Sequence, residues 1–482
     1  MNDYLSVMDG AEAFFINVTQ QYLEGESMLG FELLIPIDLL VENYRQVGFD
    51  LFLLRLPNVL MFLLVILSFF GLGRKLFGAR TMLLSILIVS STFLIVPVTK
   101  FIGLDIWLLA CQLIGFLSLI LLLKKPSWKW RALFWICTLF AIRTNPNYAA
   151  FYSIGMWLFL MIFHPEGKNL RSPLDILLGI LAIGFTFLVN TYLGSFQYDW
   201  FFEVLFIRPE NYFYGNLIGI LPWIGFLPAV FWDLFQKLKK KEEMAIILSG
   251  FLLFSILSFG LILQVVLALL IAKQIENYFK PNYPYSNLIK SFAVLSVIFS
   301  FFVVAFFLMS GYDQFREIGF RSRMGVAGVY WAFGFFGIIG LIGKDRKMMV
   351  GGFSLSGMLG MLLFWAQIVP LLENYRNFPL KIVEAIEEVS DKKDEPVFFY
   401  EPFFELPLRN QIYLRSKKIN YSKLDKNQTV EDLNGLLVLS DSMFLKLDST
   451  FLENIGIIEI TGRNGIFEED QKVWVLKREV SQ

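Results

Sequence analysis

The feature that most constrains this chain is a series of long apolar runs, most of them about 18–22 residues in length. A helix of about 20 apolar residues crosses the hydrocarbon core of a bilayer, so such runs predict membrane-spanning helices. Of the 482 residues, 56% are hydrophobic and 17% are charged, whereas soluble domains carry about 25% charged residues. We therefore expect an all-α polytopic membrane domain of about 12 transmembrane or re-entrant helices, followed by a small C-terminal α/β soluble domain.

The apolar runs give the expected spanning segments. These are 51–71, 81–98, 104–123, 132–142, 147–163, 174–193, 216–236, 244–261, 262–272, 291–309, 325–343 and 348–365. The run 132–142 is too short to cross alone and is followed by RTNPN at 143–147, so we expect a helix pair that meets near one membrane face. The stretch 244–272 is too long for one helix and predicts either a tight hairpin or one crossing plus a re-entrant piece.

The Lys and Arg content of the connecting segments predicts the orientation, because cytoplasmic loops carry an excess of these residues. One set of connections is strongly basic, for example 124–131 and 237–241. The alternate set holds only Lys100, Arg143, Arg208, Arg316, Arg321 and Arg323. We therefore expect the basic connections to be cytoplasmic and both terminal regions to lie on the outer face of a bacterial-type cytoplasmic membrane.

Three regions are expected along the chain. Residues 1–50 predict amphipathic helices on the outer face, at 12–24 and 37–46, and residues 51–369 form the transmembrane domain. Residues 370–482 predict the extracytoplasmic α/β domain. Within that domain we expect a helix at 380–389 and strands at 396–400, 435–439, 457–460 and 473–476.

The residue types present exclude several classes of site. The only histidine, His164, is interpreted as a solvated helix end, so His-based metal sites and Ser-His-Asp triads are excluded and no metal ligands are predicted. The chain has neither a P-loop nor a dinucleotide-binding fingerprint. Cys111 and Cys137 lie in apolar runs and form no disulfide framework. A formal net charge of zero gives no support for nucleic-acid binding.

Charged and polar residues gather, by topology, at the outer ends of the expected helices. They are Asp9, Glu12, Arg55, Lys100, Asp105, Arg143, Asn145, Asn147, Asp199, Glu203, Arg208, Glu210, Tyr212 and Tyr214. Ionisable groups at membrane depth are costly and are functional candidates by default. Both signs of charge at one face suit transfer of a sugar from a lipid phosphate, in which a carboxylate takes the acceptor proton and cations hold the departing phosphate. The alternative is interfacial anchoring and helix-end ion pairing.

Several stretches, in this order, resemble the type C (GT-C) membrane glycosyltransferases, the group that holds the lipid A aminoarabinose transferases and the protein O-mannosyltransferases. They are 9–15 (DGAEAFF), 22–25 (YLEG), 52–57 (FLLRLP), 76–78 (LFG), 100–108, 208–214 (RPENYFY), 221–223 (LPW), 396–400 (PVFFY) and 413–415 (YLR). The resemblance covers nearly the whole chain. The family's adjacent Asp-Glu pair falls on Ala11 and Glu12, and its lysine near the helix break falls on Asn145. Only eight residues precede Asp9, so we expect the family's first transmembrane helix to be missing from this sequence.

The resemblance implies a role for each candidate residue. The acceptor-side base would be Glu12, with Asp9 one helical turn before it, and Asp105 would position the acceptor or a divalent cation. The donor phosphate would be bound by Arg143, Arg208, Lys100 and Arg55, and the substrate lined by Asn145, Tyr212 and Tyr214. The partners implied are a polyprenyl-phosphate sugar donor, a lipid, glycan or protein acceptor, and membrane lipids.

Two other functions remain open at this stage. A relative that keeps the fold but has lost catalysis would bind lipid or partner proteins. A transporter or flippase would show paired repeats and charges near mid-membrane, and the sequence has neither.

Overall fold

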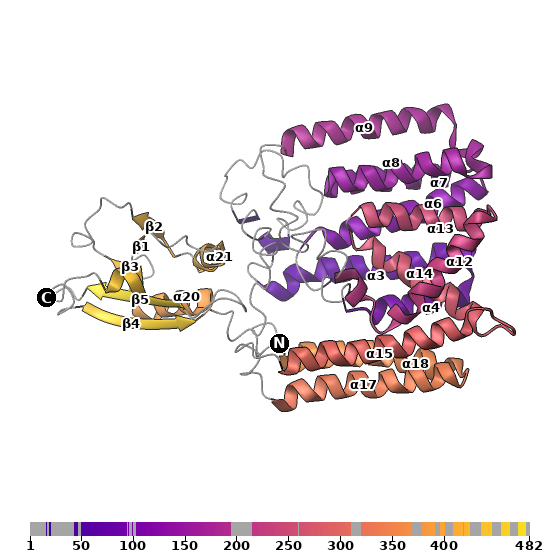
Figure 1. The fold of residues 1–482 in the computed structure, drawn as a ribbon. Helices are drawn as coiled ribbons and strands as arrows, with labels where there is room; N and C mark the ends of the chain where they lie inside the picture. The colour runs from indigo at the N-terminus through magenta and orange to yellow at the C-terminus, as the bar shows by residue number, and fades with distance from the viewer. Residues whose placement is uncertain are drawn as a thin grey trace.

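The computed structural model has a helical bundle at one end and a small mixed sheet at the other (Figure 1). The residues it describes are 16, 19–20, 43–46, 50–93, 95, 99, 103–193, 215–258, 260–309, 320–368, 378–390, 396–400, 408–417, 419–424, 435–445, 455–462 and 471–478. The expectation of a polytopic helical domain followed by a small α/β domain is confirmed.

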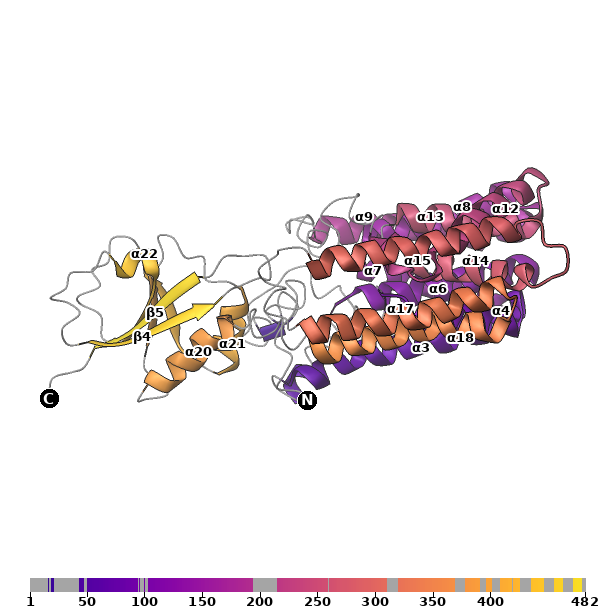
Figure 2. The ribbon, with the colours of Figure 1, turned by 60° about the horizontal axis from the view of Figure 1, so that its bottom comes forward.

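The bundle is built from long, roughly parallel and antiparallel helices (Figures 1 and 2). They are α3 (Leu51–Phe77), α4 (Ala79–Ser90), α6 (Asp105–Lys124), α7 (Trp128–Thr144), α8 (Pro146–Phe163), α9 (Pro173–Leu193), α12 (Leu227–Lys239), α13 (Glu243–Leu257), α14 (Ile262–Tyr278), α15 (Ser286–Met309), α17 (Phe320–Ile342) and α18 (Arg346–Leu363). Three short helical segments, η3 (Pro165–Leu170), η4 (Trp223–Phe226) and η5 (Phe364–Ile368), join or extend them.

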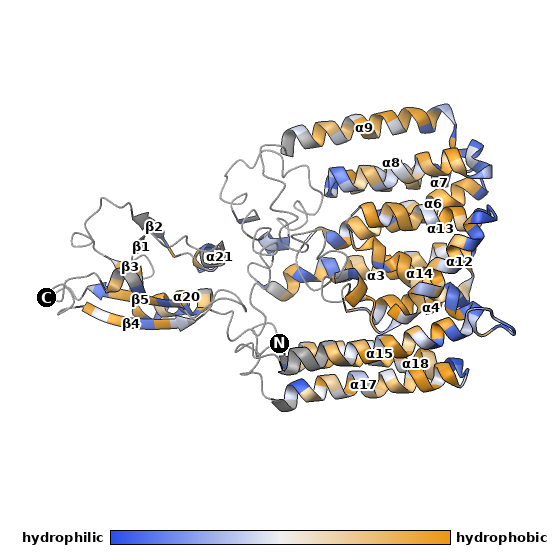
Figure 3. Ribbon diagram, in the orientation of Figure 1, coloured by the Kyte–Doolittle hydropathy of each residue, from blue (hydrophilic) through white to orange (hydrophobic). Residues whose placement is uncertain are grey.

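Side-chain caps explain where several of these helices begin. The Asp50 carboxylate accepts hydrogen bonds from the backbone N of Phe52 and Leu53 at the start of α3, and Asp345 does the same for Lys347 and Met348 in α18. Apolar residues cover the lengths of the helices, and polar residues gather at their ends (Figure 3). This distribution suits a bilayer, because apolar side chains match the hydrocarbon core and the polar ends reach its surfaces.

Five helices in the described part of the chain are long and apolar enough to cross a membrane. They are α3, α6, α8, α17 and α18, and shorter apolar helices accompany them. Their burial differs sharply: 78% of the apolar window of α6 is buried inside the protein, against 28% for α3. Helix α6 therefore runs through the centre of the bundle, and α3 presents most of its surface outward.

The structure corrects the expected boundaries in three places. Helix α7 has 17 residues, so it extends well beyond the short run at 132–142. The expected single span at 216–236 is wrong, because a cis peptide at Leu221–Pro222 and the segment η4 separate residues 215–219 from α12. Helix α4 ends at Ser90, earlier than the expected boundary at 98. The stretch 244–272 is a hairpin of α13 and α14, one of the two predicted alternatives.

Glycines allow α18 to pack closely against α17 and against the end of α4. A Cβ on Gly352 of α18 would overlap the backbone N of Gly337 on α17, and a Cβ on Gly357 would overlap the carbonyl oxygen of Ser91. Small residues allow helix backbones to approach closely in membranes, where dispersion contacts rather than water exclusion drive packing.

The C-terminal domain is a five-stranded sheet in the order β2-β1-β3-β5-β4. Its strands are β1 (Val397–Tyr400), β2 (Tyr421–Leu424), β3 (Leu436–Ser440), β4 (Ile455–Gly462) and β5 (Gln471–Arg478). The first three are parallel, and β5 pairs antiparallel with β3 and β4. The helices α20 (Phe378–Val389), α21 (Leu408–Ser416) and α22 (Asp441–Phe444) accompany the sheet (Figure 1).

A side chain near the start of the chain contacts this C-terminal domain. The amide nitrogen of Gln20 donates hydrogen bonds to the Tyr44 hydroxyl at 2.8 Å and to the carbonyl oxygen of Ile412 in α21 at 3.3 Å. Gln20 is buried, as are Ile16 and Thr19. The N-terminal residues that the structure describes therefore pack against the C-terminal domain, at the end of the bundle that faces it.

Candidate functional site

Two predicted site residues, Arg55 and Asp105, lie on helices that a buried asparagine ties together. Asn58 on α3 donates from Nδ2 to the carbonyl oxygen of Gly103 at 3.2 Å, and its Oδ1 accepts from Trp107 Nε1 at 2.8 Å. Arg55 lies one helical turn before Asn58 and is 8% exposed. Asp105 is the first residue of α6, two residues after Gly103. The Asn58 bridge therefore holds both residues at the same end of the bundle.

The position of Asp105 also bears on its charge. Its carboxylate sits in the first turn of α6, and α6 has no other side-chain cap among the described residues. The free backbone N–H groups and the helix dipole favour a negative charge at a helix N-terminus. Asp105 is partly exposed. The structure thus presents an acidic group at the N-terminus of α6, a helix that is largely buried.

Arg143 and Asn145 lie at the junction of α7 and α8, at the same end of the bundle as Asp105. Arg143 is in the last turn of α7, where the helix dipole favours a cation. Asn145 caps α8: its side-chain oxygen accepts from the backbone N of Tyr148, and Pro146 takes the first helical position. Asn145 is 9% exposed. Its capping role explains an asparagine at this junction without any ligand.

The other predicted site residues lie outside the described part of the chain. They are Asp9, Glu12, Lys100, Arg208, Tyr212 and Tyr214. Of the described residues nearest to them, Thr99 precedes α6, and Leu193 and Gly215 flank the 194–214 connection. Four predicted residues are therefore placed at one end, and the roles of all ten stay predictions.

Sequence reasoning missed several buried polar side chains near this end. Asn58 and Trp107 make the bridge described above, and two glutamines, Gln112 on α6 and Gln264 on α14, are 1% and 0% exposed. The signal in the sequence was a single amide inside each otherwise apolar run. Such residues are costly in a membrane and are functional candidates for the same reason as the charges.

The opposite end of the bundle holds a buried carboxylate that has several hydrogen-bond partners. Asp175, at the start of α9, is 0% exposed. Its Oδ1 accepts from Arg131 Nε at 2.9 Å and from Trp135 Nε1 at 3.0 Å, and its Oδ2 accepts from Ser172 Oγ at 2.6 Å. This network joins α7 to α9 and has the complete set of partners that a buried carboxylate requires.

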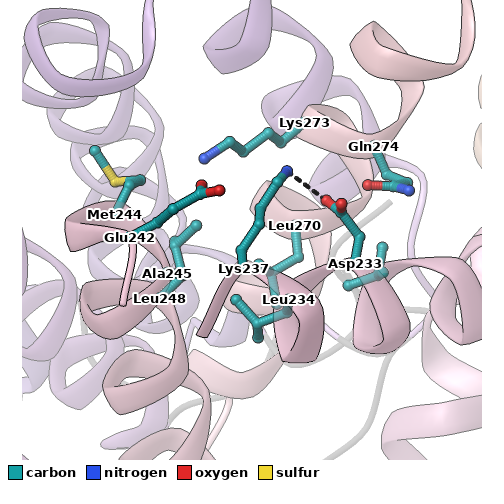
Figure 4. A pocket seen from close by; sticks show the side chains of 11 residues that line it. Asp233, Leu234, Lys237, Glu242, Met244, Ala245, Leu248, Leu270, Lys273 and Gln274 are labelled. Atoms are coloured by element: carbon teal, nitrogen blue, oxygen red, sulfur yellow. Dashed lines mark hydrogen bonds and ion pairs between the residues drawn. The ribbon is translucent and has the colours of Figure 1, made fainter. Parts of the chain in front are cut away.

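A small pocket lies at that same end, between α12, α13 and α14 (Figure 4). Its volume is about 30 Å³, which suits about two water molecules and is too small for a sugar ring. Asp233 and Lys237 form an ion pair at 2.5 Å, and Glu242 and Lys273 point into the same space (Figure 4). Two cations and two carboxylates balance, so the pocket has no net charge to attract an anion.

The prediction that His164 is solvated is wrong. The side chain is 6% exposed, and its Nδ1 accepts a hydrogen bond from the backbone N of Glu166 at 3.1 Å. Burial lowers the pKa of His164, because desolvation disfavours the imidazolium. His164 therefore caps the connection between α8 and α9 as a neutral side chain.

Among the described residues, no group of three or more His, Cys, Asp or Glu side chains could hold a metal ion. A divalent cation near Asp105 would need further ligands from segments outside the described part of the chain.

Comparisons with known proteins agree with the resemblance noted from the sequence. Residues 43–192 match the model of the dolichyl-phosphate-mannose-protein mannosyltransferase family. ArnT from Cupriavidus metallidurans, bound to undecaprenyl phosphate, superposes with a TM-score of 0.66 at 14% identity, over 98% of this chain and 95% of that one. The protein has the GT-C fold. ArnT in its apo state gives a TM-score of 0.63, also at 14% identity, over the same shares of the two chains.

The GT-C fold match extends through the whole chain, whereas the family match is confined to 43–192. No protein with a curated description matches this chain by sequence. The family match nevertheless covers α3, α6, α7 and α8, which carry Arg55, Asp105, Arg143 and Asn145. The part of the GT-C protein most like known mannosyltransferases is therefore the part that carries the described candidate residues.

Proposed function

We propose that this protein is a membrane glycosyltransferase that moves a sugar from a polyprenyl-phosphate donor to an acceptor at the outer face of the cytoplasmic membrane. The observation that carries the proposal is the position of Arg55, Asp105 and Arg143 at one end of a GT-C fold, on helices that match a mannosyltransferase family. The solved ArnT structure with undecaprenyl phosphate supports a polyprenyl-phosphate donor.

The reaction forms one bond and breaks another. The acceptor hydroxyl gives its proton to a carboxylate, Glu12 with Asp9 beside it, and its oxygen attacks the anomeric carbon of the sugar. The bond between that carbon and the phosphate oxygen breaks, and polyprenyl phosphate departs with the electron pair. Arginine side chains stabilise this developing charge, because their planar donor forks match phosphate oxygens. Arg143 and Arg208 take this role, with Arg55 and Lys100 adding positive charge.

Asp105 is assigned to the acceptor or to a divalent cation that orients it. Its place in the first turn of α6, where a helix favours a negative charge, suits hydrogen bonding to an acceptor hydroxyl. Asn145, Tyr212 and Tyr214 line the substrate. The bridge from Asn58 to Gly103 and Trp107 fixes Asp105 relative to Arg55, which serves the positional accuracy that group transfer requires.

The test of this function is transfer of labelled sugar from polyprenyl-phosphate donors in membranes that contain the protein. Glu12→Gln and Arg143→Ala should each abolish transfer while the protein remains folded. Lys129→Ala is the matched control for Arg143→Ala, because Lys129 is an exposed cation at the other end of the same helix, and it should keep full activity. Unchanged activity in both Glu12→Gln and Arg143→Ala would remove these assignments.

The proposed orientation has its own test. A cysteine introduced at the exposed Lys472 of β5 should react with a membrane-impermeant reagent added to intact cells, and a cysteine at Lys240 should not. The C-terminal domain lies at the bundle end opposite the basic connections (Figure 1), so both results are expected together. Labelling of Lys240→Cys from outside would reverse the topology.

A second candidate function is lipid binding without catalysis. It is favoured by one observation, that Asn145 stands where the family carries a lysine and is engaged in capping α8. A wild-type protein that binds polyprenyl phosphate but transfers no sugar to any acceptor would support this second function.

A further inference from the structure

A glutamine in the centre of the bundle has a side chain without partners among the described residues. Gln112 on α6 is 1% exposed, and neither its Oε1 nor its Nε2 has a hydrogen-bond partner in the part of the chain that the structure describes. Buried polar groups are almost always hydrogen-bonded, and inside a membrane domain no bulk water can replace the missing partners. An apolar residue would be less costly here, so the amide needs an explanation outside the fold.

The Gln112 amide lies against the turn between α13 and α14. A Cβ on Gly260 would lie 3.6 Å from Gln112 Oε1, and the nearby Ser258 is buried. Gln112 is seven residues after Asp105, so it lies on the same face of α6 and about 10 Å deeper in the bundle. Gly260 is partly exposed. The amide therefore lies below Asp105, next to a turn that reaches accessible space.

The α13–α14 turn stops well short of the bundle end that carries Asp105. Phe254, three residues before the end of α13, packs directly on Gly155 of α8. Gly155 lies nine residues after the start of α8, so α13 ends about two helical turns deeper than α8 begins. The α13–α14 turn, which we call the floor, thus lies deeper in the bundle than Asp105, Arg143 and Asn145.

A second buried glutamine belongs to this floor. Gln264, in the first turn of α14, is 0% exposed, and its Nε2 donates to the carbonyl oxygen of Asn216 at 2.7 Å and to Asn216 Oδ1 at 2.9 Å. Its Oε1 has no partner among the described residues. Asn216 lies just after the 194–214 connection. The floor therefore offers one amide donor, from Gln112, and two amide acceptors, from Gln112 and Gln264.

We propose that Gln112 and Gln264 form the floor of the donor's sugar subsite and hydrogen-bond the hydroxyl groups of a neutral sugar. Hydroxyl groups both donate and accept, so a sugar ring satisfies all three free amide positions. A phosphate accepts only and would leave both glutamine oxygens without partners, and an isoprenoid chain would satisfy none.

This inference rests on the proposed function, and its test separates the two. The purified full-length protein is titrated with undecaprenyl phosphate carrying a neutral hexose, and separately with undecaprenyl phosphate alone. Gln112→Met, which keeps the side-chain length, should weaken binding of the glycosylated lipid about tenfold, the loss expected for one or two hydrogen bonds to a buried group. Its affinity for undecaprenyl phosphate should stay within about twofold of the wild type. Without the free amide, Gln112→Met should be at least as heat-stable as the wild type.

Two further variants keep the test decisive. Ser118→Ala removes a buried hydroxyl from the same helix, but Ser118 donates only to its own helix backbone, at Ile114 and Gly115, so both affinities should be unchanged. Gly260→Ala places a methyl group beside Gln112 Oε1 at ordinary contact distance and should also weaken only the glycosylated lipid. Equal loss for both lipids, or no loss in Gln112→Met and Gly260→Ala, would overturn the inference. If the wild type binds neither lipid, the proposed function itself fails.

Discussion

Asp175 and Gln112, two buried polar side chains in different parts of the bundle, differ in their hydrogen bonding. At the basic end, Asp175 is completely buried and each of its oxygens accepts hydrogen bonds from named partners on α7 and the start of α9. Toward the other end, Gln112 is just as buried and has no partner among the described residues. A buried group with all its partners, such as Asp175, holds helices together, whereas Gln112 is a buried group whose missing partners we propose a ligand supplies. The contrast between these two side chains therefore distinguishes a structural role from a proposed binding role.

The largest expected effect comes from Asp105 at the second of these ends. Asp105→Asn keeps the shape of the side chain but removes its charge, so transfer should fall about 10²–10⁴-fold. The melting temperature should change little, because Asp105 is partly exposed at a helix terminus. The measurement pairs the transfer assay with thermal unfolding in detergent. A large loss of stability with normal transfer would mean that Asp105, like Asp175, has a structural role, and would contradict the comparison.

The reverse pattern is expected for Asp175. Asp175→Ala leaves Arg131, Trp135 and Ser172 without their common acceptor, and should destabilise the protein by about 3 kcal/mol. Transfer per folded molecule should remain near the wild-type rate. Asp233→Asn is the control, because this ion pair with Lys237 is partly exposed and one helical turn apart, so its loss should cost only about 0.5 kcal/mol. If Asp175→Ala lowered transfer although the protein was fully folded, Asp175 would influence the reaction at the other end of the bundle.

The α17–α18 contact allows the loss of a polar interaction to be compared with a packing defect, which involves no polar group. Gly352→Ala places a methyl group in the backbone of Gly337 and should destabilise the protein by about 2 kcal/mol. Its neighbour Gly351 has nothing within 4 Å of the position that a methyl group would take, so Gly351→Ala should be neutral or stabilise by about 0.5 kcal/mol. Thermal unfolding of the two variants side by side makes the comparison. Equal stability of both would mean that α17 and α18 are less tightly packed than the structure describes.

The smallest expected effect is a pH dependence at the basic end. The pKa of His164 is lowered by burial, so the unfolded chain takes up a proton at a higher pH than the folded protein does. Stability from this group is therefore complete above the unfolded pKa of about 6.5 and is lost as pH falls below it. His164→Gln should flatten the melting temperature between about pH 7.5 and pH 5. A wild-type melting temperature that rises on acidification, and falls back in His164→Gln, would contradict a neutral His164.

Much of the fold could be predicted because each apolar run is long enough to specify a helix by itself. The helix boundaries were harder to predict, because they depend on local features of the sequence. Helix α7 begins at Trp128 although Lys129 and Arg131 follow, since long cationic side chains tolerate a helix end at a membrane surface. The break before α12 lies inside an apolar run, where hydropathy carries no information on backbone direction. The edge strand β2 (YSKL) was missed because it lacks an apolar run.

The candidate site could be predicted only in part. Charged residues at helix ends are visible in sequence, and Arg55, Asp105, Arg143 and Asn145 do lie at one end of the bundle. The glutamines could not be singled out, since one amide hardly changes the hydropathy of a 20-residue helix such as α6. Gln112 differs from a satisfied buried amide because it has no hydrogen-bond partner among the described residues. Its surroundings depend on a turn about 150 residues away in the sequence. Such information exists only in three dimensions.

The hydrogen bond from Gln20 to Ile412 has a consequence for the order in which contacts form during synthesis. Almost all of the sequence that forms the helical bundle lies between the two residues, so the ribosome makes Ile412 much later than Gln20. Gln20 therefore lacks this partner while the helices between the two residues are inserted. The contact between the described N-terminal residues and the C-terminal domain thus forms only after α21 has been made, late in synthesis.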